Sequence, residues 1–264
     1  MEWWLGYLAV GAVVGFFAGL LGIGGGAIMV PLLVMLFDAQ GLPRDHMLHV
    51  AVGTAMATVL FNSIASAHAH ASLGAIRWDL AARITPGILA GGLLGSGIAS
   101  VIPRGLFAAL FTGVVYLAAT NILFGRKPRA SRQVPGIVGM FMVGFVISAV
   151  SALGALGGAF ITVPFLMYCN VPMLQAIGTA AAVGFPIGLA GSIGFVFTGW
   201  GQTGIPGPSL GYVYLPALAG ILIASVLTAP LGARLAHRIS TTRLQQIFAV
   251  VLYVFATRML ISLL

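Results

Sequence analysis

The feature that most constrains the fold is a succession of apolar runs, most of them about twenty residues long, that fill almost the whole chain. The runs cover residues 4–22, 25–37, 46–70, 80–101, 105–124, 135–156, 158–169, 173–199, 212–233 and 243–263. A helix needs roughly 20 apolar residues to cross a bilayer core of about 30 Å. Only 6% of the 264 residues are charged, against about 25% in soluble domains. The sequence therefore predicts an all-α polytopic membrane protein. The continuous runs exclude a membrane β-barrel, whose strands alternate in polarity.

Two of these runs, 25–37 and 158–169, are too short to cross a bilayer as helices. At about 1.5 Å per residue the first spans about 20 Å, and the second spans less. Each is the second segment in a set of five, and a basic linker separates the two sets. We therefore expect an N-terminal transmembrane repeat over 1–124, a basic cytoplasmic linker over 125–134 and a C-terminal transmembrane repeat over 135–264.

The basic residues predict which side of the membrane each loop faces. The linker carries Arg126, Lys127, Arg129 and Arg132. Cytoplasmic loops are enriched in Lys and Arg, so we place the linker inside the cell and alternate the segments from there. Nine of the twelve basic residues then lie inside, and only Arg44, Arg104 and Arg258 lie outside. This orientation places both termini outside the cell.

The two halves of the chain resemble each other. Residues 24–31 match residues 157–164, 133 positions later, around a shared Gly-Gly and Val-Pro pattern. Residues 51–55 match residues 176–180, 125 positions later, around a shared Gly-Thr pair. A third offset of 137 positions aligns Ser72-Leu73-Gly74 with Ser209-Leu210-Gly211, Gly95 with Gly232, Phe111 with Phe248, Tyr116 with Tyr253, and Ala119-Thr120 with Ala256-Thr257. The offset changes only in expected loops, so the chain is an internal repeat.

The odd number of segments in each half makes the second copy enter the membrane from the opposite side. Such inverted-topology repeats are found in many secondary transporters. The charges agree, because the loop at Arg104 is expected outside while the matching loop around Arg238 and Arg243 is expected inside. The predicted architecture is two inverted-topology repeats of about five helical segments each.

Glycine accounts for 37 residues, about twice its usual share. Two sets are spaced by four residues: Gly11, Gly15 and Gly19, and Gly87, Gly91 and Gly95. We expect each set to line one helix face, where a neighbouring backbone approaches closely.

Glycine is also clustered at 22–26 and 154–158, just before each short run. Clustered glycine predicts a broken helix near the bilayer midplane, where free backbone must be satisfied by protein or line a wet cavity. The helix that restarts after the break presents free amides and the positive end of its dipole, which together bind anions. A tight turn between two packed helices is the alternative. The residues expected to bind an anionic substrate here are Gly24, Gly25, Gly26, Gly157 and Gly158.

Two repeated Gly-Thr pairs, Gly53-Thr54 and Gly178-Thr179, complete the expected substrate site. A Thr hydroxyl in these pairs either donates to a substrate oxygen or bonds back to a carbonyl of its own helix, and both interpretations stay open here. Repeat symmetry predicts one central site that draws on both Gly-Thr pairs and on both glycine clusters.

These paired motifs resemble those of the TauE/SafE family, also called the sulfite exporter or toluene sulfonate uptake permease family. The resemblance rests on residues 24–31, on their twin that ends in Thr162-Val163-Pro164, and on the Gly-Thr pairs, and it covers nearly the whole chain. It implies a multi-pass secondary transporter in the bacterial inner membrane for small sulfur-containing anions such as sulfite, sulfonates or sulfoacetate. The expected partners are the anion and the lipid bilayer, with no cofactor, and a homodimer is left open.

Other functional classes fit the sequence less well. The four acidic residues lie at segment ends or in loops: Glu2, Asp38, Asp45 and Asp79. We therefore expect no intramembrane carboxylate relay. His46 and His49 lack a third ligand for a metal site, and Ser96, between two glycines, has no catalytic base for an enzyme. His68 is the titratable group expected nearest the pathway. The basic residues lie in loops and indicate topology rather than nucleic-acid binding. A passive anion channel is the alternative function, because the same helix N-termini would serve it.

Overall fold

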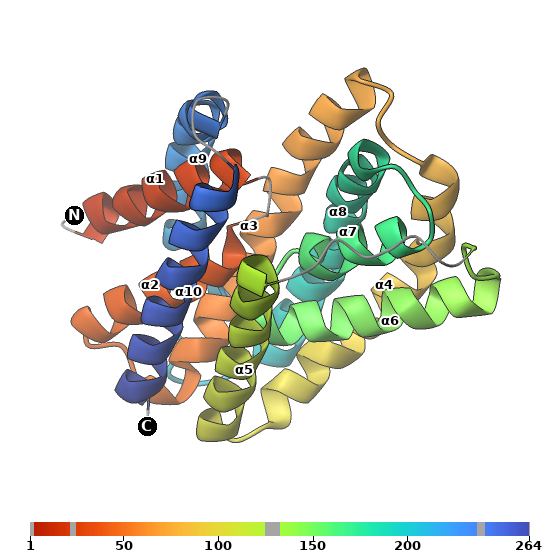
Figure 1. Cartoon of the computed structure of the whole chain (residues 1–264). Coiled ribbons are helices and arrows are strands. Elements are labelled where there is room, and N and C mark those ends of the chain that lie inside the picture. The colour runs from red at the N-terminus through yellow and green to blue at the C-terminus, as the bar shows by residue number, and fades with distance from the viewer. Residues whose placement is uncertain (1–2, 22–24, 125–132, 237–240, 264) are drawn as a thin grey trace.

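The computed structural model describes residues 3–21, 25–124, 133–236 and 241–263 (Figure 1). Within these residues the chain forms ten α-helices and one two-stranded hairpin. The elements are α1 (Trp3–Leu21), α2 (Gly26–Ala39), α3 (Arg44–Ser72), α4 (Trp78–Val101), α5 (Arg104–Phe124), α6 (Ile137–Gly154), α7 (Ala159–Tyr168), α8 (Met173–Gly199), β1 (Ser209–Leu210), β2 (Val213–Tyr214), α9 (Leu215–Ala236) and α10 (Thr241–Leu263). The expected all-α class is confirmed.

The helix lengths follow the apolar runs. Five of the described helices, α3, α4, α5, α6 and α8, are long and apolar enough to cross a membrane. The two short runs form the short helices α2 and α7, with 14 and 10 residues. The helices α3 and α8 begin directly after Pro43 and Pro172, whose φ angles of −56° and −55° suit the first turn of a helix.

Helices from opposite halves of the sequence pack in pairs. α1 lies along α9, and α4 lies along α6. Figure 1 shows the first pair on one side of the molecule and the second pair on the other. In each pair a glycine faces the partner's backbone. A Cβ at Gly11 would lie 2.6 Å from the Ile221 carbonyl oxygen, and one at Gly144 would lie 2.4 Å from the Ile84 carbonyl oxygen. These are matching positions at the offsets of 133 and 137 residues.

The two sets of glycines spaced by four have the expected role where their surroundings are described. Gly11 and Gly15 meet the backbone of α9, and Gly87, Gly91 and Gly95 meet the backbone of α6. A side chain at any of these positions would push the paired helices apart. The surroundings of Gly19 lie outside the described residues.

The centre of the molecule is the contact between α3 and α8, which also come from opposite halves. A Cβ at Gly188 would lie 2.5 Å from the Leu60 amide nitrogen. A Cβ at Gly184 would lie 2.5 Å from Ser63 Oγ. Because residue numbers rise along α3 as they fall along α8, the two helices run antiparallel, and glycines of α8 bring them into close contact.

Candidate substrate site at the starts of helices α2 and α7

The first glycine cluster caps the short helix α2. Gly25 is buried and has a left-handed φ of 30°, and its carbonyl accepts the amides of Ile28 and Met29 at 3.3 and 3.1 Å. These are the first amides bonded within the helix, so the amides of Gly26 and Ala27 have no acceptor inside α2. The start of α2 therefore presents backbone donors toward whatever lies in front of it.

The second glycine cluster forms a turn between α6 and α7. Its backbone is left-handed at Ala155, Gly157 and Gly158, with φ angles of 51°, 59° and 77°. Left-handed geometry disfavours side chains with a Cβ, which explains two of the glycines. The chain changes direction in this turn, between the end of α6 and the start of α7.

The start of α7 repeats the hydrogen bonding of α2. The Gly158 carbonyl accepts the amides of Ile161 and Thr162 at 3.1 and 2.9 Å. The amides of Ala159 and Phe160 precede these and have no acceptor inside α7. Both short helices thus begin with a left-handed glycine and two amides that are free of intrahelical bonds.

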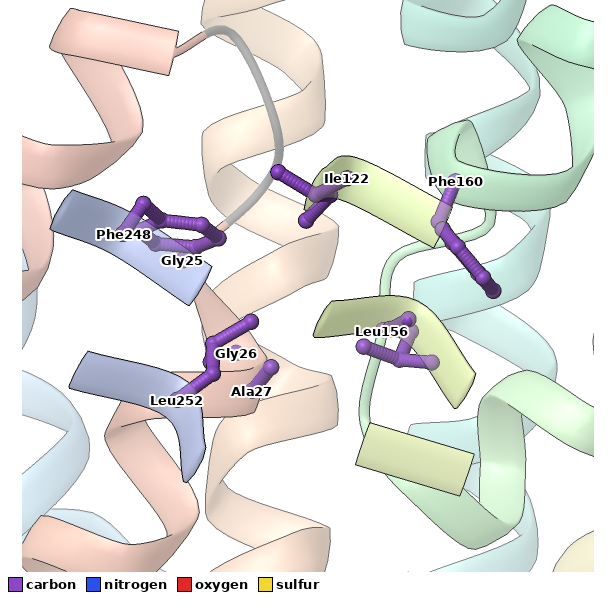
Figure 2. Close-up of a pocket in the computed structure, with 9 residues that line it drawn as sticks. Gly25, Gly26, Ala27, Ile122, Leu156, Phe160, Phe248 and Leu252 are labelled. Atoms are coloured by element: carbon purple, nitrogen blue, oxygen red, sulfur yellow. The ribbon is translucent and has the colours of Figure 1, made fainter. Parts of the chain in front are cut away.

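The start of α2 meets the second glycine cluster. A Cβ at Gly26 would lie only 2.0 Å from the Ala155 carbonyl oxygen, so the α2 start touches the α6–α7 turn directly. Figure 2 shows the cavity at this junction. It is lined by Gly25, Gly26 and Ala27 of α2, Leu156 and Phe160 of the second half, Ala118 and Ile122 of α5, and Phe248 and Leu252 of α10.

This cavity is small and apolar. Its volume of about 10 Å³ is close to the least that one water molecule needs. All the side chains that line it are hydrocarbon, so polar groups can reach it only from the backbone (Figure 2). The junction is therefore closed in this structure. An oxyanion larger than water can enter only if the surrounding helices rearrange. Gly24, also expected at this site, lies outside the described residues.

The first Gly-Thr pair holds a segment that comes from the other half of the chain. The Tyr214 amide donates to Thr54 Oγ1 at 3.0 Å. A Cβ at Gly53 would lie 2.6 Å from the Tyr212 carbonyl oxygen. Residues 212–214, just before α9, are thereby seated on α3. We call them the 212–214 segment.

The second Gly-Thr pair holds the matching segment of the first half. The Arg77 amide donates to Thr179 Oγ1, also at 3.0 Å. A Cβ at Gly178 would lie 2.3 Å from the Ala75 carbonyl oxygen. Residues 75–77, just before α4, are thereby seated on α8, and we call them the 75–77 segment. Neither threonine makes the bond to its own helix considered from the sequence, and each hydroxyl keeps its proton for donation.

The expectation of one central site drawing on both Gly-Thr pairs is corrected by this arrangement. Ser63 of α3 lies opposite Gly184 of α8, and the two helices are antiparallel. Thr54 precedes Ser63 on α3 and Thr179 precedes Gly184 on α8, so the two threonines lie in opposite directions from this contact. At 1.5 Å per residue they are separated by roughly 20 Å along the helices. A small anion cannot contact both. The glycine clusters are brought together, whereas the Gly-Thr pairs are not.

An imidazole cluster near the start of α3 includes Tyr212, a partner that the sequence does not indicate. His46 and His49 lie on one face of α3, and both contact Tyr212 of the hairpin turn. The Tyr212 hydroxyl lies 3.3 Å from His46 Nδ1. His68 instead lies exposed. Among the described residues no group of three His, Cys, Asp or Glu is placed to hold a metal ion.

Five helices able to span a membrane, with the α2 start against the α6–α7 turn, fit a membrane transporter, and comparison with known proteins gives the same class. The family described as Sulfite exporter TauE/SafE matches residues 7–259. The chain therefore belongs to the TauE/SafE family, as the sequence motifs indicate.

Relatives of similar length carry transporter names. A "Probable membrane transporter protein" of Haemophilus influenzae is 37% identical over 263 residues, covering 97% of each chain. One of Methanocaldococcus jannaschii is 29% identical over 262 residues, covering 96% of this chain and 94% of its own. YdhB of Bacillus subtilis, with the same description, is 26% identical over 195 residues, covering 71% of this chain and 77% of its own. No solved structure matches the chain.

Proposed function

We propose that the protein is a secondary transporter that carries small sulfur-containing anions, such as sulfite, sulfonates or sulfoacetate-like compounds, across the bacterial inner membrane. The family description supports the sulfur chemistry, and the names of the relatives support transport. The predicted orientation, with both termini outside the cell and the 125–134 linker inside, is part of the proposal.

The observation that carries the proposal is the contact between the α2 start and the α6–α7 turn that leads into α7. Gly26 touches the Ala155 carbonyl there, and each helix offers two amides without an intrahelical acceptor. Free amides at a helix start, with the positive end of the helix dipole, favour an anion over a cation. The anion is held at these amides, at the interface of the two repeats and near the bilayer midplane.

The proposal includes two inverted-topology repeats that exchange access to this site between the two sides of the membrane. Matched contacts support the repeat: Thr54 binds the Tyr214 amide as Thr179 binds the Arg77 amide, with partners related by 125 and 137 positions. The closed junction supports alternating access, because an anion larger than water enters only after the surrounding helices move.

Transport by purified protein in liposomes tests the function. Radiolabelled sulfite, a sulfonate, a small carboxylate and a sodium or neutral solute are offered in turn. We expect saturable uptake of a sulfur oxyanion, accelerated by the same anion trapped inside the vesicles. Uptake of cations or neutral solutes alone would refute the anion proposal. Anion flux without saturation or counterflow would instead establish the passive channel.

Substitution of Gly26 by alanine tests the site. Its methyl group would lie 2.0 Å from the Ala155 carbonyl oxygen, and backbone atoms cannot move aside as a flexible side chain can. We expect Gly26→Ala to lower the initial transport rate at least tenfold. Gly113→Ala is the matched control, because a Cβ at this helical glycine meets no atom within 4 Å. Equal rates in the two variants, both monodisperse by gel filtration, would place the anion elsewhere.

A further inference from the structure

One histidine is buried where the 212–214 segment meets α3. His49 is only 5% exposed, and its Nε2 lies 3.0 Å from the Ala99 carbonyl oxygen. Its ring stacks on Tyr212 with 5.1 Å between ring centroids and lies 4.9 Å from the Phe107 ring. The second ring nitrogen, Nδ1, is buried and has no hydrogen-bond partner among the residues that the structure describes. The imidazole is therefore enclosed on several sides and satisfied at one nitrogen.

The partners of this ring define its protonation in the packed state. A carbonyl oxygen only accepts hydrogen bonds, so Nε2 of His49 carries a proton and donates to Ala99. Nδ1 is then the bare nitrogen of a neutral ring. A proton added to Nδ1 would make a buried cation whose new N–H faces no acceptor in the described part of the chain, which is strongly unfavourable. The protonated ring has to leave its packed position.

The ring is packed against the element that the first Gly-Thr pair seats. Tyr212 stacks on His49, and the carbonyl of the same Tyr212 lies over Gly53. His49 and Gly53 are four residues apart on α3, so they share one helix face. Loss of the His49 packing therefore removes one of the supports that hold the 212–214 segment on α3.

The matching segment in the other half has no such group. The position 125 residues after His49 is Leu174, which is 59% exposed. The position 137 residues before Tyr212 is Ala75, whose side chain cannot stack on a ring. The backbone contacts of the two segments are alike, whereas a buried imidazole is present at the 212–214 segment only.

We infer that His49 is a proton-binding residue that holds the 212–214 segment against α3 when neutral and releases it when protonated. The inference rests on the proposed function in one respect: the 212–214 segment covers the end of α3 that we place outside the cell. Protonation from that side would then favour opening of one entrance to the pathway, which supplies a coupling of transport to the proton.

Other ionisable groups lie near this ring, and one is a rival. His46, on the same helix, is packed on Tyr212 and lies within hydrogen-bond distance of its hydroxyl, which faces the cluster from the hairpin turn. From α5, Arg104 pairs with Asp45 at 3.6 Å, at the start of α3. From α4 the ring meets the Ala99 carbonyl. His46 therefore needs its own variant in the test.

The expected change with pH in the ratio of open to packed molecules follows from the difference in proton binding between the two forms. The released ring is in water, where an imidazole has a pKa of about 6.5. The open form thus binds the extra proton and the packed form does not, so acid favours the open form. For one such group, the ratio of open to packed molecules rises about tenfold between pH 7.5 and pH 5.5.

Thiol accessibility measures this ratio without any transported anion. In a Cys169→Ala background, Val213→Cys places a reporter in the 212–214 segment, where the native side chain is 4% exposed. Ile76→Cys, 137 positions earlier, places a matched reporter in the 75–77 segment, where the native side chain is 9% exposed. Modification rates in liposomes are normalised to those of the same protein in denaturing detergent at each pH.

We expect the reporter at position 213 to react about tenfold faster at pH 5.5 than at pH 7.5, and the reporter at position 76 to change less than twofold. His49→Gln keeps a donor where Nε2 stood but cannot be protonated, so it should abolish the dependence. A dependence that survives His49→Gln, or one that His46→Gln abolishes alone, would overturn the inference. If His49→Gln does not fold, His49→Asn is measured in its place.

The readout also separates the two proposals. If the reporter at position 213 shows the expected pH dependence but the protein transports no sulfur anion, the proposed substrate is refuted and the His49 inference stands. If the protein transports sulfite but the reporter at position 213 shows no pH dependence, the His49 inference is refuted and the proposed function stands.

Discussion

The hydroxyl of Thr54 accepts the backbone amide of Tyr214 at 3.0 Å, across 160 positions of sequence. Thr179 accepts the amide of Arg77 at the same distance, at the other end of the α3–α8 pair. In both cases the threonine belongs to one half of the chain and the amide to the other. The Gly-Thr pairs therefore fasten the two halves together, whatever else they bind.

Loss of either threonine hydroxyl should destabilise the protein. Thr54→Val keeps the shape of the side chain and leaves the Tyr214 amide without an acceptor, which costs about 1–3 kcal/mol for a buried group. Thr179→Val should lower the stability by a similar amount, because it leaves the Arg77 amide without an acceptor. The measurement is the midpoint of thermal unfolding in detergent, where both variants should unfold at lower temperature than the native protein.

The serine variants are the controls, because Thr54→Ser and Thr179→Ser keep the acceptor oxygen and should unfold near the native midpoint. Anion affinity is measured on the same proteins. If a hydroxyl also donates to the anion, its valine variant binds more weakly by roughly 0.5–3 kcal/mol. Since the two positions lie roughly 20 Å apart, at most one can contact a given small anion. Valine variants with native stability would contradict the fastening role.

Much of the fold could be predicted from sequence because its rules are local. Apolar runs give helices, and two runs too short to cross gave α2 and α7. Glycines four residues apart share a helix face, so Gly87 and Gly91 could be assigned to close packing before the partner helix α6 was known.

The role of the Gly-Thr pairs could not be predicted because their partners come from the other half of the chain. Sequence offsets show which positions are equivalent, but they do not show which positions of the two halves lie close together. Gly26 lies against Ala155 of the other half, whereas Thr54 and Thr179 are displaced along α3 and α8 in opposite directions. The same limit hid the His49 cluster, since Tyr212 is far from His49 in sequence.

The glycines of the Gly-Thr pairs should not tolerate alanine. A methyl group at Gly53 would lie 2.6 Å from the Tyr212 carbonyl oxygen, and one at Gly178 would lie 2.3 Å from that of Ala75. Each variant should move its segment away from the helix that carries the glycine. The amide that donates to the neighbouring threonine, that of Tyr214 or Arg77, should then exchange its hydrogen faster. Gly97→Ala is the control, because a Cβ there meets nothing within 4 Å. Unchanged exchange at Tyr214 in Gly53→Ala would contradict the seating.

The contact between α5 and α10 offers a second pair of matched bonds. Tyr116 shares a hydrogen bond with Thr257, and Tyr253 shares one with Thr120, at positions related by 137 residues. Tyr116→Phe and Tyr253→Phe each remove one hydroxyl, so each should lower stability by about 0.5–1.5 kcal/mol. Thermal unfolding in detergent checks this. Strongly unequal losses would show that the two bonds are not equivalent.

Labelling in intact cells tests the orientation. In the Cys169→Ala background, a cysteine at exposed Thr203, in the loop before β1, should react with a membrane-impermeant maleimide from outside. A cysteine at Ala130, in the basic linker and outside the described residues, should react only after the membrane is permeabilised. The reason is the distribution of charge, because cytoplasmic loops gather Lys and Arg.

Contacts among the described loops make this labelling prediction specific. The Asp45–Arg104 pair at 3.6 Å joins the start of α3 to the start of α5, and Tyr212 packs on His46 near the same point. These three elements must therefore face one side, which is also the side predicted for Thr203. A cysteine at exposed Pro103, next to Arg104, should consequently label from outside together with position 203. If position 130 labels from outside and position 203 does not, the orientation is the reverse of the predicted one. If positions 203 and 130 label from the same side, the chain between them crosses the membrane an even number of times, which contradicts the inverted repeat.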